Sequence, residues 1–368
     1  MLWIPGPTEV RPEILAECAR PMIGHRSAAM SELVERVDAH LGLLFGLDSG
    51  TTARPAVAPC SATGMMEGAL VAVEKRVLCI VNGAFSKRWY QIAQSRGLDA
   101  VALEVEWGQA VDDTELARVL DQDGPFDAVT MVCNETSTGV RTPIRLVANV
   151  LQAFPDTLLL VDTVSLISGA AVDFDDNLVD FMLAGTQKAL ALPPGLAVYC
   201  CSEDWVERAQ ANEQRGWYLD PLRHLEGHEA RKTPATPCIP LYYALAQQLE
   251  DISAGRTLPA AEQQLEGAAA WQARFQKHER MQARTLAWAA ERGLEPFPGE
   301  GFRSPTVSCI RAGELDVAAL TAGLAERDLQ ISNGYGPLKG QTFRIGHMGD
   351  HTEEGLEALL AAMDDVLG

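Results

Sequence analysis

Two short apolar runs, joined by a polar connection, constrain the fold of this chain more than any other feature. The first covers residues 157–161 and the second covers residues 180–184. Both are only a few residues long and are bounded by polar or small residues, which is typical of strands buried on both faces of a parallel sheet. Other strand-like and helix-like segments alternate before the first run, and one more strand-like segment follows the second. The sequence therefore predicts an α/β fold, with a mostly parallel sheet covered by helices on both faces.

Side chains that carry chemistry follow both runs. Asp162 comes directly after the first run, and Gln187 and Lys188 follow the second. Because ligands of open α/β sheets bind outside the carboxyl ends of the strands, we expect these side chains to face one crevice. An aspartate at a strand end is more often a turn residue, and a single lysine is usually solvated. A carboxylate and a lysine held together, however, are what a pyridoxal phosphate (PLP) enzyme requires, for the ring nitrogen and for the Schiff base.

The overall charge and the cysteines narrow the class of protein. The 368 residues suggest two domains, and the net charge of −20 disfavours nucleic acid and anionic membranes as partners. The eight cysteines include no CxxC pair and no regular spacing, as expected for a reducing compartment. No apolar run approaches the ~18 residues of a membrane helix, and the first residues lack the basic region of a signal peptide. We expect a cytoplasmic protein.

Proline and polar content predict where the chain is irregular. Several prolines within residues 1–25 predict an extended arm rather than a helix. The next segment, Ser31–Phe45, is predicted to be a helix capped by its first residue. Residues 204–232 are polar and are predicted to be irregular. His224 and His228 lie there without a third ligand, so we expect surface histidines and no metal site.

The C-terminal third is predicted to form a smaller α+β unit. Residues 259–292 contain no proline after the first position and predict one long helix or a broken pair. Beyond them the expected elements are strands 306–310 and 342–347 and helices 317–327 and 352–367. Asp350 and Glu353 resemble a capping box for the last helix. We expect three units: an N-terminal arm, a large domain and a small domain, over residues 1–20, 21–255 and 256–368.

A phosphate-binding loop is predicted nearer the N-terminus. The small and hydroxyl residues Ser61 to Gly64 precede a predicted helix over residues 65–74. Free N–H groups and the dipole at a helix N-terminus favour an anion, although this pattern alone is more often only a cap. The following strand, residues 77–81, ends in an Asn-Gly turn and Phe85, and a later strand ends in the polar residues 134–139.

These motifs together resemble one enzyme family. The segments VDTVSLISG and AGTQKALALPPG resemble the class V aminotransferases, PLP-dependent enzymes of fold type I, and in particular the alanine–glyoxylate and serine–pyruvate branch. The similarity runs from GPTEV near the N-terminus to FRIGHMGD near the C-terminus. It implies a large domain with a seven-stranded, mostly parallel sheet, a smaller α+β C-terminal domain and a homodimer. It also implies PLP as cofactor and transfer of amino groups between amino acids and 2-oxo acids.

The resemblance assigns a role to residues along the whole chain. Lys188 would form the Schiff base and Asp162 would hold the ring nitrogen. The cofactor-binding positions implied by the match are Ser61, Ala62, Thr63, Phe85, Thr136, Asp162, Val164, Gln187 and Lys188. Among them the 61–63 loop would grip the phosphate, and Phe85 would stack on the ring where the branch has a tryptophan.

Other implied roles concern the substrate and a second subunit. Arg344 would grip the α-carboxylate of the substrate with two parallel hydrogen bonds, and His25 and Pro7 are further substrate-binding candidates. A threonine of the 232–237 loop would reach the cofactor phosphate of the partner subunit. The alignment leaves Thr233 and Thr236 both open, with Thr236 preferred.

We expect alanine or serine as donor and glyoxylate or pyruvate as acceptor, because no second cationic pocket for a dicarboxylate is evident. Three alternatives remain. A 2-aminoethylphosphonate transaminase would need a cluster of basic residues to bind the phosphonate, and the only candidates are His25, Arg26 and Arg344. A cysteine desulfurase would need a cysteine on a mobile loop, whereas Cys309 lies in a strand-like run. The third alternative is a non-catalytic partner subunit, since relatives have been labelled a hydrogenase small subunit. Iron–sulfur ligation would need clustered cysteines, and their absence from the sequence disfavours a redox role.

Overall fold

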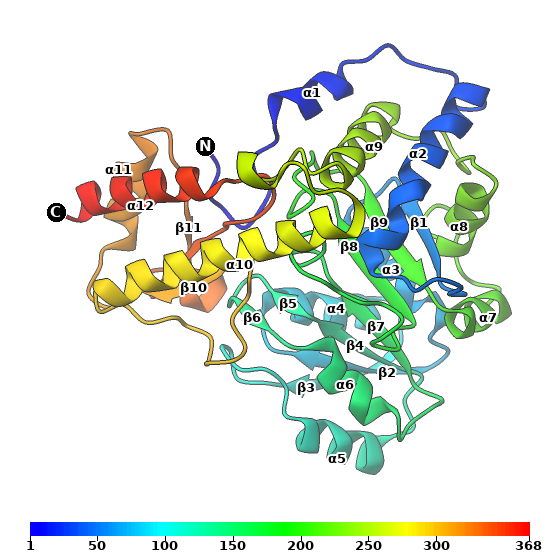
Figure 1. Cartoon of the computed structure of the whole chain (residues 1–368). Helices are drawn as coiled ribbons and strands as arrows, with labels where there is room; N and C mark the ends of the chain where they lie inside the picture. Colours follow the sequence, from blue (N-terminus) through cyan, green and yellow to red (C-terminus); the bar gives the residue numbers. More distant parts are fainter.

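The computed structural model describes all 368 residues, which form a large α/β part and a smaller C-terminal part (Figure 1). The centre of the large part is a seven-stranded sheet with the order β1–β9–β8–β7–β4–β2–β3. Its strands are β1 Arg54–Ala58, β2 Arg76–Val81, β3 Asp99–Glu104, β4 Ala128–Val132, β7 Leu158–Asp162, β8 Phe181–Gly185 and β9 Ala197–Cys201. Only the contacts of β9 with its two neighbours are antiparallel, so the predicted mostly parallel sheet is confirmed.

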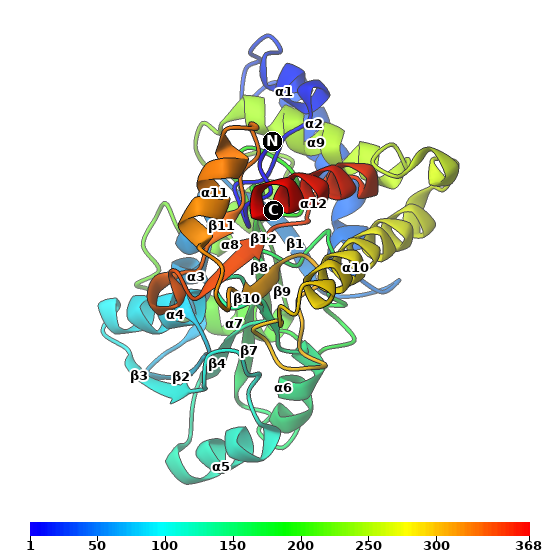
Figure 2. The same ribbon diagram turned by 90° about the vertical axis from the view of Figure 1, so that its left-hand side faces the viewer.

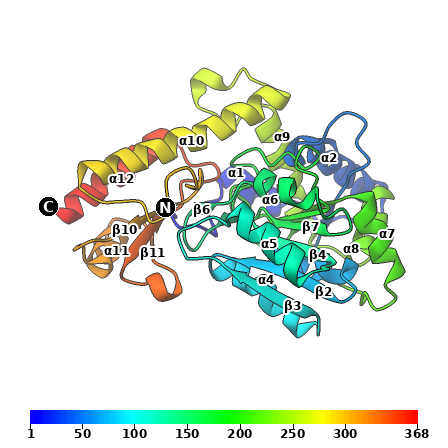
Figure 3. The ribbon, with the colours of Figure 1, turned by 90° about the horizontal axis from the view of Figure 1, so that it is seen from below.

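The two apolar runs singled out from the sequence are the neighbouring strands β7 and β8, and every residue of both is buried. Their side chains alternate between two apolar clusters, as the pleat of a strand requires. Leu159 and Val161 belong to the cluster on one face, whereas Leu158 and Leu160 belong to the cluster on the other. Figure 3 shows helices α4 and α6 on opposite sides of the sheet. Burial on both faces explains why these strands are continuously apolar.

Eight helices belong to this large part. They are α2 Ala28–Phe45, α3 Ala62–Ala69, α4 Ala84–Ser95, α5 Asp113–Asp123, α6 Ile144–Leu151, α7 Glu203–Ala211, α8 Pro221–Glu229 and α9 Ile239–Ser253. A two-stranded ribbon, β5 Asn134–Glu135 and β6 Val140–Arg141, follows β4. No helix of the chain combines the length and the apolar character that crossing a bilayer requires.

The smaller part is an antiparallel three-stranded sheet of order β10–β12–β11 with helices α11 and α12. Its elements are β10 Ser308–Arg311, α11 Val317–Ala325, β11 Ser332–Asn333, β12 Thr342–Ile345 and α12 Glu353–Leu367. The 25-residue helix α10, Gly267–Glu291, joins the two parts, as Figure 1 shows. These elements confirm the predicted α+β unit. The N-terminus lies beside α12 (Figure 2), where the Trp3 ring stacks on His351 with ring centroids 3.9 Å apart.

Three local predictions were wrong. Residues 12–18 form helix α1, Pro12–Cys18, rather than an extended arm; its proline is at the first helical position, where no N–H is needed. Helix α2 begins at Ala28 because Ser27, not Ser31, accepts the capping bond, from the Met30 N–H at 3.4 Å. Residues 204–232 are not irregular, since α7 and α8 occupy most of them.

His224 and His228 are buried on α8 rather than exposed. His224 Nε2 lies 2.7 Å from the Tyr218 carbonyl oxygen, and His228 Nε2 lies 3.2 Å from Asp38 Oδ1. Burial lowers the pKa of His224, so its ring is a neutral packing and hydrogen-bonding group.

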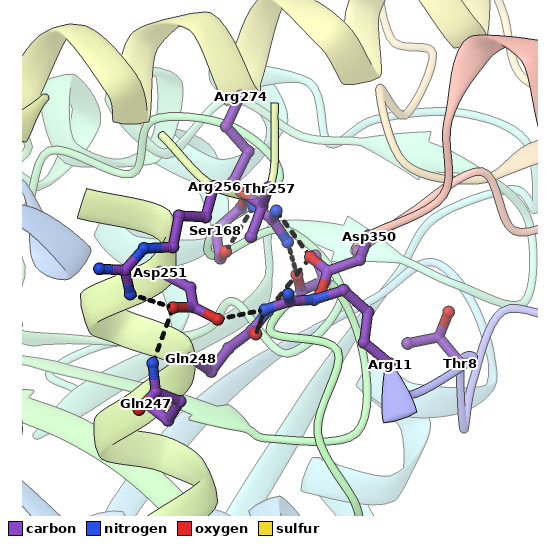
Figure 4. Close-up of polar contacts among 12 residues, drawn as sticks. Thr8, Arg11, Ser168, Gln247, Gln248, Asp251, Arg256, Thr257, Arg274 and Asp350 are labelled. Atoms are coloured by element: carbon purple, nitrogen blue, oxygen red, sulfur yellow. Dashed lines mark hydrogen bonds and ion pairs between the residues drawn. The ribbon is translucent and has the colours of Figure 1, made fainter. Parts of the chain in front are cut away.

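The predicted capping box at the start of the last helix was also wrong. Thr352 caps α12, with its hydroxyl accepting from the Gly355 N–H at 3.0 Å. Asp350 instead turns inward and joins a buried network of arginines between the two parts (Figure 4).

Candidate active site

The loops that follow β7 and β8 meet the N-terminus of α3 at one pocket. Asp162 is the last residue of β7 and pairs in register with Leu183 of β8, and Lys188 follows the end of β8. The volume of the pocket is about 80 Å³, below the roughly 300–1,000 Å³ of small-molecule sites. The sequence-predicted residues that line it are Ser61, Ala62, Thr63, Phe85, Thr136, Asp162, Val164, Gln187 and Lys188.

Asp162 is a buried carboxyl group with one oxygen left over. Oδ1 accepts a hydrogen bond from the Val164 N–H at 2.7 Å, and Oδ2 accepts none. Burial raises the pKa of Asp162 to about 7, while the Val164 N–H opposes the shift. A cationic group placed against Oδ2 would favour the ionised form. The free oxygen is therefore suited to a protonated ring nitrogen.

Lys188 is 9% exposed, and its amine donates a hydrogen bond to the Pro5 carbonyl. Nζ lies 5.7 Å from the centroid of the Phe85 ring. Burial, followed by the charge of Arg344, lowers the pKa of Lys188 to about 8. A larger fraction of this amine is neutral near pH 7 than in a solvated lysine, as a nucleophile or a base requires.

Gly6, a residue that the sequence analysis did not single out, packs against Lys188. Its φ of +105° favours glycine, and a Cβ built there would lie 2.5 Å from Lys188 Cδ. The GPT tripeptide of the N-terminal motif contained this signal. The segment that carries Pro5 and Gly6 thus covers the lysine.

The predicted phosphate loop is the start of α3. The Ser61 hydroxyl accepts from the Gly64 N–H at 3.4 Å, and the Thr63 hydroxyl accepts from Arg88 Nη1 at 3.2 Å. Arg88 also lines the pocket, has no carboxylate partner, and lies 5.0 Å from the centroid of the Phe85 ring. Arg88 is therefore a further cation of the site, and the sequence analysis did not single it out. Arg88 follows Phe85 by three positions, and this i, i+3 spacing was the signal for it.

Glu135 fixes the helix that carries Phe85, and this residue also escaped the sequence analysis. Its carboxylate is fully buried and accepts from the backbone N–H groups of Phe85 at 3.1 Å and Ser86 at 2.9 Å. A Cβ at Gly83 would lie 2.4 Å from Glu135 Cγ, so the turn needs glycine for the close approach. An anion at a helix N-terminus is stabilised by the free N–H groups there. Glu135 thereby sets where the Phe85 ring lies.

Arg344 projects from β12 of the smaller part and is 7% exposed. Nε and Nη2 donate to the Asn333 carbonyl at 3.2 and 3.1 Å, and Nη1 donates to the Thr136 carbonyl at 3.1 Å. A guanidinium has five N–H groups, so one remains free on each of Nη1 and Nη2. No acidic side chain pairs with it, and burial lowers its pKa. The two free donors, beside the pocket residue Thr136, are suited to a carboxylate.

Besides Arg344, four predicted residues lie outside the pocket. Pro7 sits between Gly6 and Thr8, whose N–H donates to the Gln187 carbonyl at 3.1 Å, so it is next to the site without lining it. His25 accepts from Arg26 Nε at 3.2 Å in the segment before α2. Thr233 and Thr236 lie between α8 and α9; the buried Thr233 hydroxyl has no hydrogen-bond partner, and Thr236 is exposed.

The residues present fit PLP. The free oxygen of Asp162 suits its ring nitrogen, and the largely desolvated Lys188 amine suits its aldehyde. The helix N-terminus at Ser61, together with the unpaired Arg88, suits its dianionic phosphate. No group of three or more histidine, cysteine, aspartate or glutamate side chains is arranged to hold a metal ion.

Comparisons with known proteins agree with this chemistry. Residues 48–305 match the family model of the class-V aminotransferases. An uncharacterized aminotransferase of Methanocaldococcus jannaschii is 35% identical, over 99% of this chain and 91% of its own length. The serine–glyoxylate aminotransferase of Methylorubrum extorquens is 30% identical, over 99% and 90%. The crystal structure of an alanine–glyoxylate aminotransferase from Nostoc superposes with a TM-score of 0.88 at 26% identity, over 100% and 95%.

Proposed function

The chain belongs to the class V aminotransferases, and on that basis we propose that it moves the amino group of alanine or serine to glyoxylate or pyruvate with PLP as cofactor. One observation carries the proposal. Lys188, with its desolvated amine, and Asp162, with its free oxygen, line one pocket, and the unpaired guanidinium of Arg344 donates to the carbonyl of Thr136, which lines the same pocket. Lys188 would supply a base, Asp162 a carboxylate partner for the ring nitrogen of the cofactor, and Arg344 a binding site for the substrate carboxylate.

The cofactor would be held by groups on four elements. Lys188 would bind its aldehyde, Asp162 its ring nitrogen, and Phe85 one face of its ring. Ser61 and Thr63 would bind the phosphate at the start of α3, and we assign Arg88 to the same phosphate because its guanidinium already contacts Thr63. When bound, PLP withdraws electrons from the α-carbon of the donor amino acid.

Lys188 Nζ would take the proton from the α-carbon of the donor and deliver it to the cofactor, and it would carry out the same transfer in reverse with the acceptor. Its pKa of about 8 leaves the amine strong enough to take a proton and neutral often enough to act near pH 7. Arg344 would hold the α-carboxylate of the donor. The Thr136 residue whose carbonyl accepts from Arg344 is itself held in place, because its buried hydroxyl donates to Ser165 Oγ at 2.9 Å.

A small donor follows from where the cations lie. Arg344 takes the α-carboxylate, and Arg88, the other unpaired cation of the site, is held at the phosphate end by Thr63. A second carboxylate on the donor would have no cation of its own. A dicarboxylate donor is the second candidate, because Arg88 lines the same pocket and carries no acidic partner.

The active form would be a homodimer in which Thr233 or Thr236 reaches the partner's cofactor phosphate, with His25 near the partner's substrate. The support is that these residues lie outside the pocket of their own chain, and that the Thr233 hydroxyl is unsatisfied. All eight cysteines are free, which suits the reducing cytoplasm. A fully active monomer in sedimentation at assay concentration would overturn the dimer.

The test is a donor and acceptor panel on purified protein and on Lys188→Ala, with the exposed Lys75→Ala as the matched control. We expect alanine or serine with glyoxylate or pyruvate to give the highest kcat/KM, Lys75→Ala to behave as wild type, and Lys188→Ala to lose turnover. Wild-type turnover by Lys188→Ala would contradict the mechanism.

Other outcomes would favour the alternatives. Preference for aspartate or 2-aminoethylphosphonate would contradict alanine or serine as the donor. Release of sulfide from cysteine would indicate a desulfurase, and a protein that retains no PLP would favour the non-catalytic subunit.

A further inference from the structure

Asp350 lies where the N-terminal segment, α9, α10 and the smaller part meet (Figure 4). Its Oδ1 accepts from Arg274 Nη1 at 2.8 Å, and its Oδ2 accepts from Arg11 Nε at 2.6 Å. The amide of the fully buried Gln248 donates to both oxygens. Burial raises the pKa of Asp350, but the charges of Arg274 and Arg11 outweigh it, and the pKa is lowered overall. One ionised carboxylate therefore serves two arginines.

Arg274 connects this network to the residue that follows the reactive lysine. Arg274 is fully buried on α10, and its Nη2 donates to the carbonyl of Ala189 at 2.8 Å. Ala189 directly follows Lys188. Arg274 Nε donates to the carbonyl of Ser168 at 3.1 Å, in the loop after β7. One guanidinium thus ties together the two loops that carry the site.

Arg11 is connected to the same lysine through the N-terminal segment that precedes it. Arg11 ends the N-terminal segment, residues 1–11, and its Nη2 also donates to Asp251 Oδ2 on α9 at 2.7 Å. Upstream of it, the Thr8 N–H donates to the Gln187 carbonyl at 3.1 Å, Gly6 packs on the lysine, and Pro5 accepts from Nζ. This segment crosses Lys188 before it reaches Asp350.

The other end of the N-terminal segment is attached independently. The Trp3 carbonyl accepts from the Gly346 N–H at 2.7 Å, and the Trp3 ring stacks on His351. The segment is therefore fixed to the smaller part at residue 3 and to the Asp350 network at residue 11. The stretch that contacts Lys188 lies between the two attachments.

We propose that Arg11, Asp350 and Arg274 are positioning residues that fix Lys188 from both sides. Arg11 holds the Pro5–Gly6 stretch over the side chain of Lys188, and Arg274 holds the backbone that follows it. None of the three touches the pocket. The inference rests on the proposed function, in which Lys188 is the reacting amine.

Arg11 is the residue to change. Removing Asp350 would leave two guanidinium groups without their carboxylate, and removing the fully buried Arg274 would open a hole in the junction, so both changes endanger folding. Arg11 is 23% exposed, and Asp350 would keep Arg274 as its partner. Arg36 is the matched control, since Nε and Nη2 pair with Glu250 on α9 at 2.7 and 2.9 Å without touching Asp350.

The experiment compares wild type, Arg11→Ala, Arg11→Lys and Arg36→Ala, each saturated with PLP. Hydrogen exchange with residue-level fragmentation reports the amides of Thr8 and Trp3. In Arg11→Ala we expect the Thr8 amide to exchange roughly 10- to 100-fold faster, the size of a lost charge-assisted contact, while Trp3 stays protected. We expect kcat for alanine to fall about tenfold, with KM within about threefold, because the lysine and not the carboxylate site is displaced.

Arg11→Lys, which keeps one charged donor for Asp350, should restore part of both effects, and Arg36→Ala should show neither. Unchanged Thr8 exchange in Arg11→Ala would refute the attachment. Faster exchange with an unchanged kcat would refute the positioning of Lys188. Failure of the proposed function looks different: wild type itself would not transaminate, or Lys188→Ala would remain active.

Discussion

Replacing Arg344 by lysine is the sharpest test of the substrate site. Arginine has five N–H groups, three of which are bonded to the carbonyls of Asn333 and Thr136, and this leaves one on each terminal nitrogen for a carboxylate. Lysine has only three N–H groups. With the same two carbonyls satisfied, it keeps at most one for the substrate.

The variant therefore loses one charge-assisted hydrogen bond to the substrate. Such a bond contributes about 1.5–3 kcal/mol. At about 1.4 kcal/mol per decade, kcat/KM should fall roughly 10- to 150-fold. The fall should be similar for alanine, serine and glyoxylate, because all three present the same carboxylate.

The assay is steady-state and single-turnover kinetics with each substrate, together with the dissociation constant of PLP. Binding of the cofactor should stay near wild type, because Arg344 donates to Asn333 and Thr136 rather than to the start of α3. Arg311→Lys is the control: Arg311 is exposed on the neighbouring strand β10 and lies over the Phe297 ring. An unchanged kcat/KM in Arg344→Lys would remove Arg344 from the substrate site and direct the search to Arg26.

Three further predictions concern the cofactor and its lysine. Asp162→Asn should still bind PLP but slow removal of the α-proton, by ~10³-fold if the ionised pair contributes ~4 kcal/mol; a rate within a few-fold of wild type would make Asp162 structural. Gly6→Ala should abolish most activity because the methyl group would meet Lys188 Cδ, whereas Gly50→Ala, also at positive φ but in open space, should leave kcat unchanged. Because burial lowers the pKa of Lys188 to about 8, the neutral amine increases as the pH rises to that value. Capture of PLP by cofactor-free protein, followed by absorbance, should therefore accelerate up to about pH 8 and then level off; a rise continuing to pH 10 would contradict the shift.

The parts of the fold that follow a local pattern could be predicted from the sequence. Strands β7 and β8 are continuously apolar because both of their faces are covered, and the pattern shows directly which residues are buried. Since parallel strands end at one edge of the sheet, it followed that Asp162 and Lys188 share a crevice. The helices α7 and α8 were missed because each buries only a short apolar stripe within a polar segment.

The residues that were missed act through tertiary contacts. Asp350 three positions before Glu353 matches a capping box, yet two arginines distant in sequence draw its carboxylate inward, and Thr352 caps the helix instead. A local pattern does not reveal a partner more than 300 positions away, such as Arg11 for Asp350. Arg88 is different: it lies on the same helix face as Phe85, so its place in the site was within reach of the sequence.

The distribution of charge explains how a chain with a net charge of −20 can bind anions. Lys188 and Arg88 line the pocket, Arg344 donates to the carbonyl of the lining residue Thr136, and neither arginine has an acidic partner. Of the nearby carboxyl groups, Asp162 has a pKa of about 7 and is only partly ionised, and Glu135 accepts hydrogen bonds from the backbone N–H groups of Phe85 and Ser86. The local field is therefore positive. Charges on the surface are screened over ~8 Å at physiological ionic strength, whereas buried charges such as those of the pocket are screened much less. A phosphate at one end and a carboxylate at the other would both lower the energy of this arrangement, so under the proposed function the ligands, rather than acidic side chains of the protein, balance the positive charge.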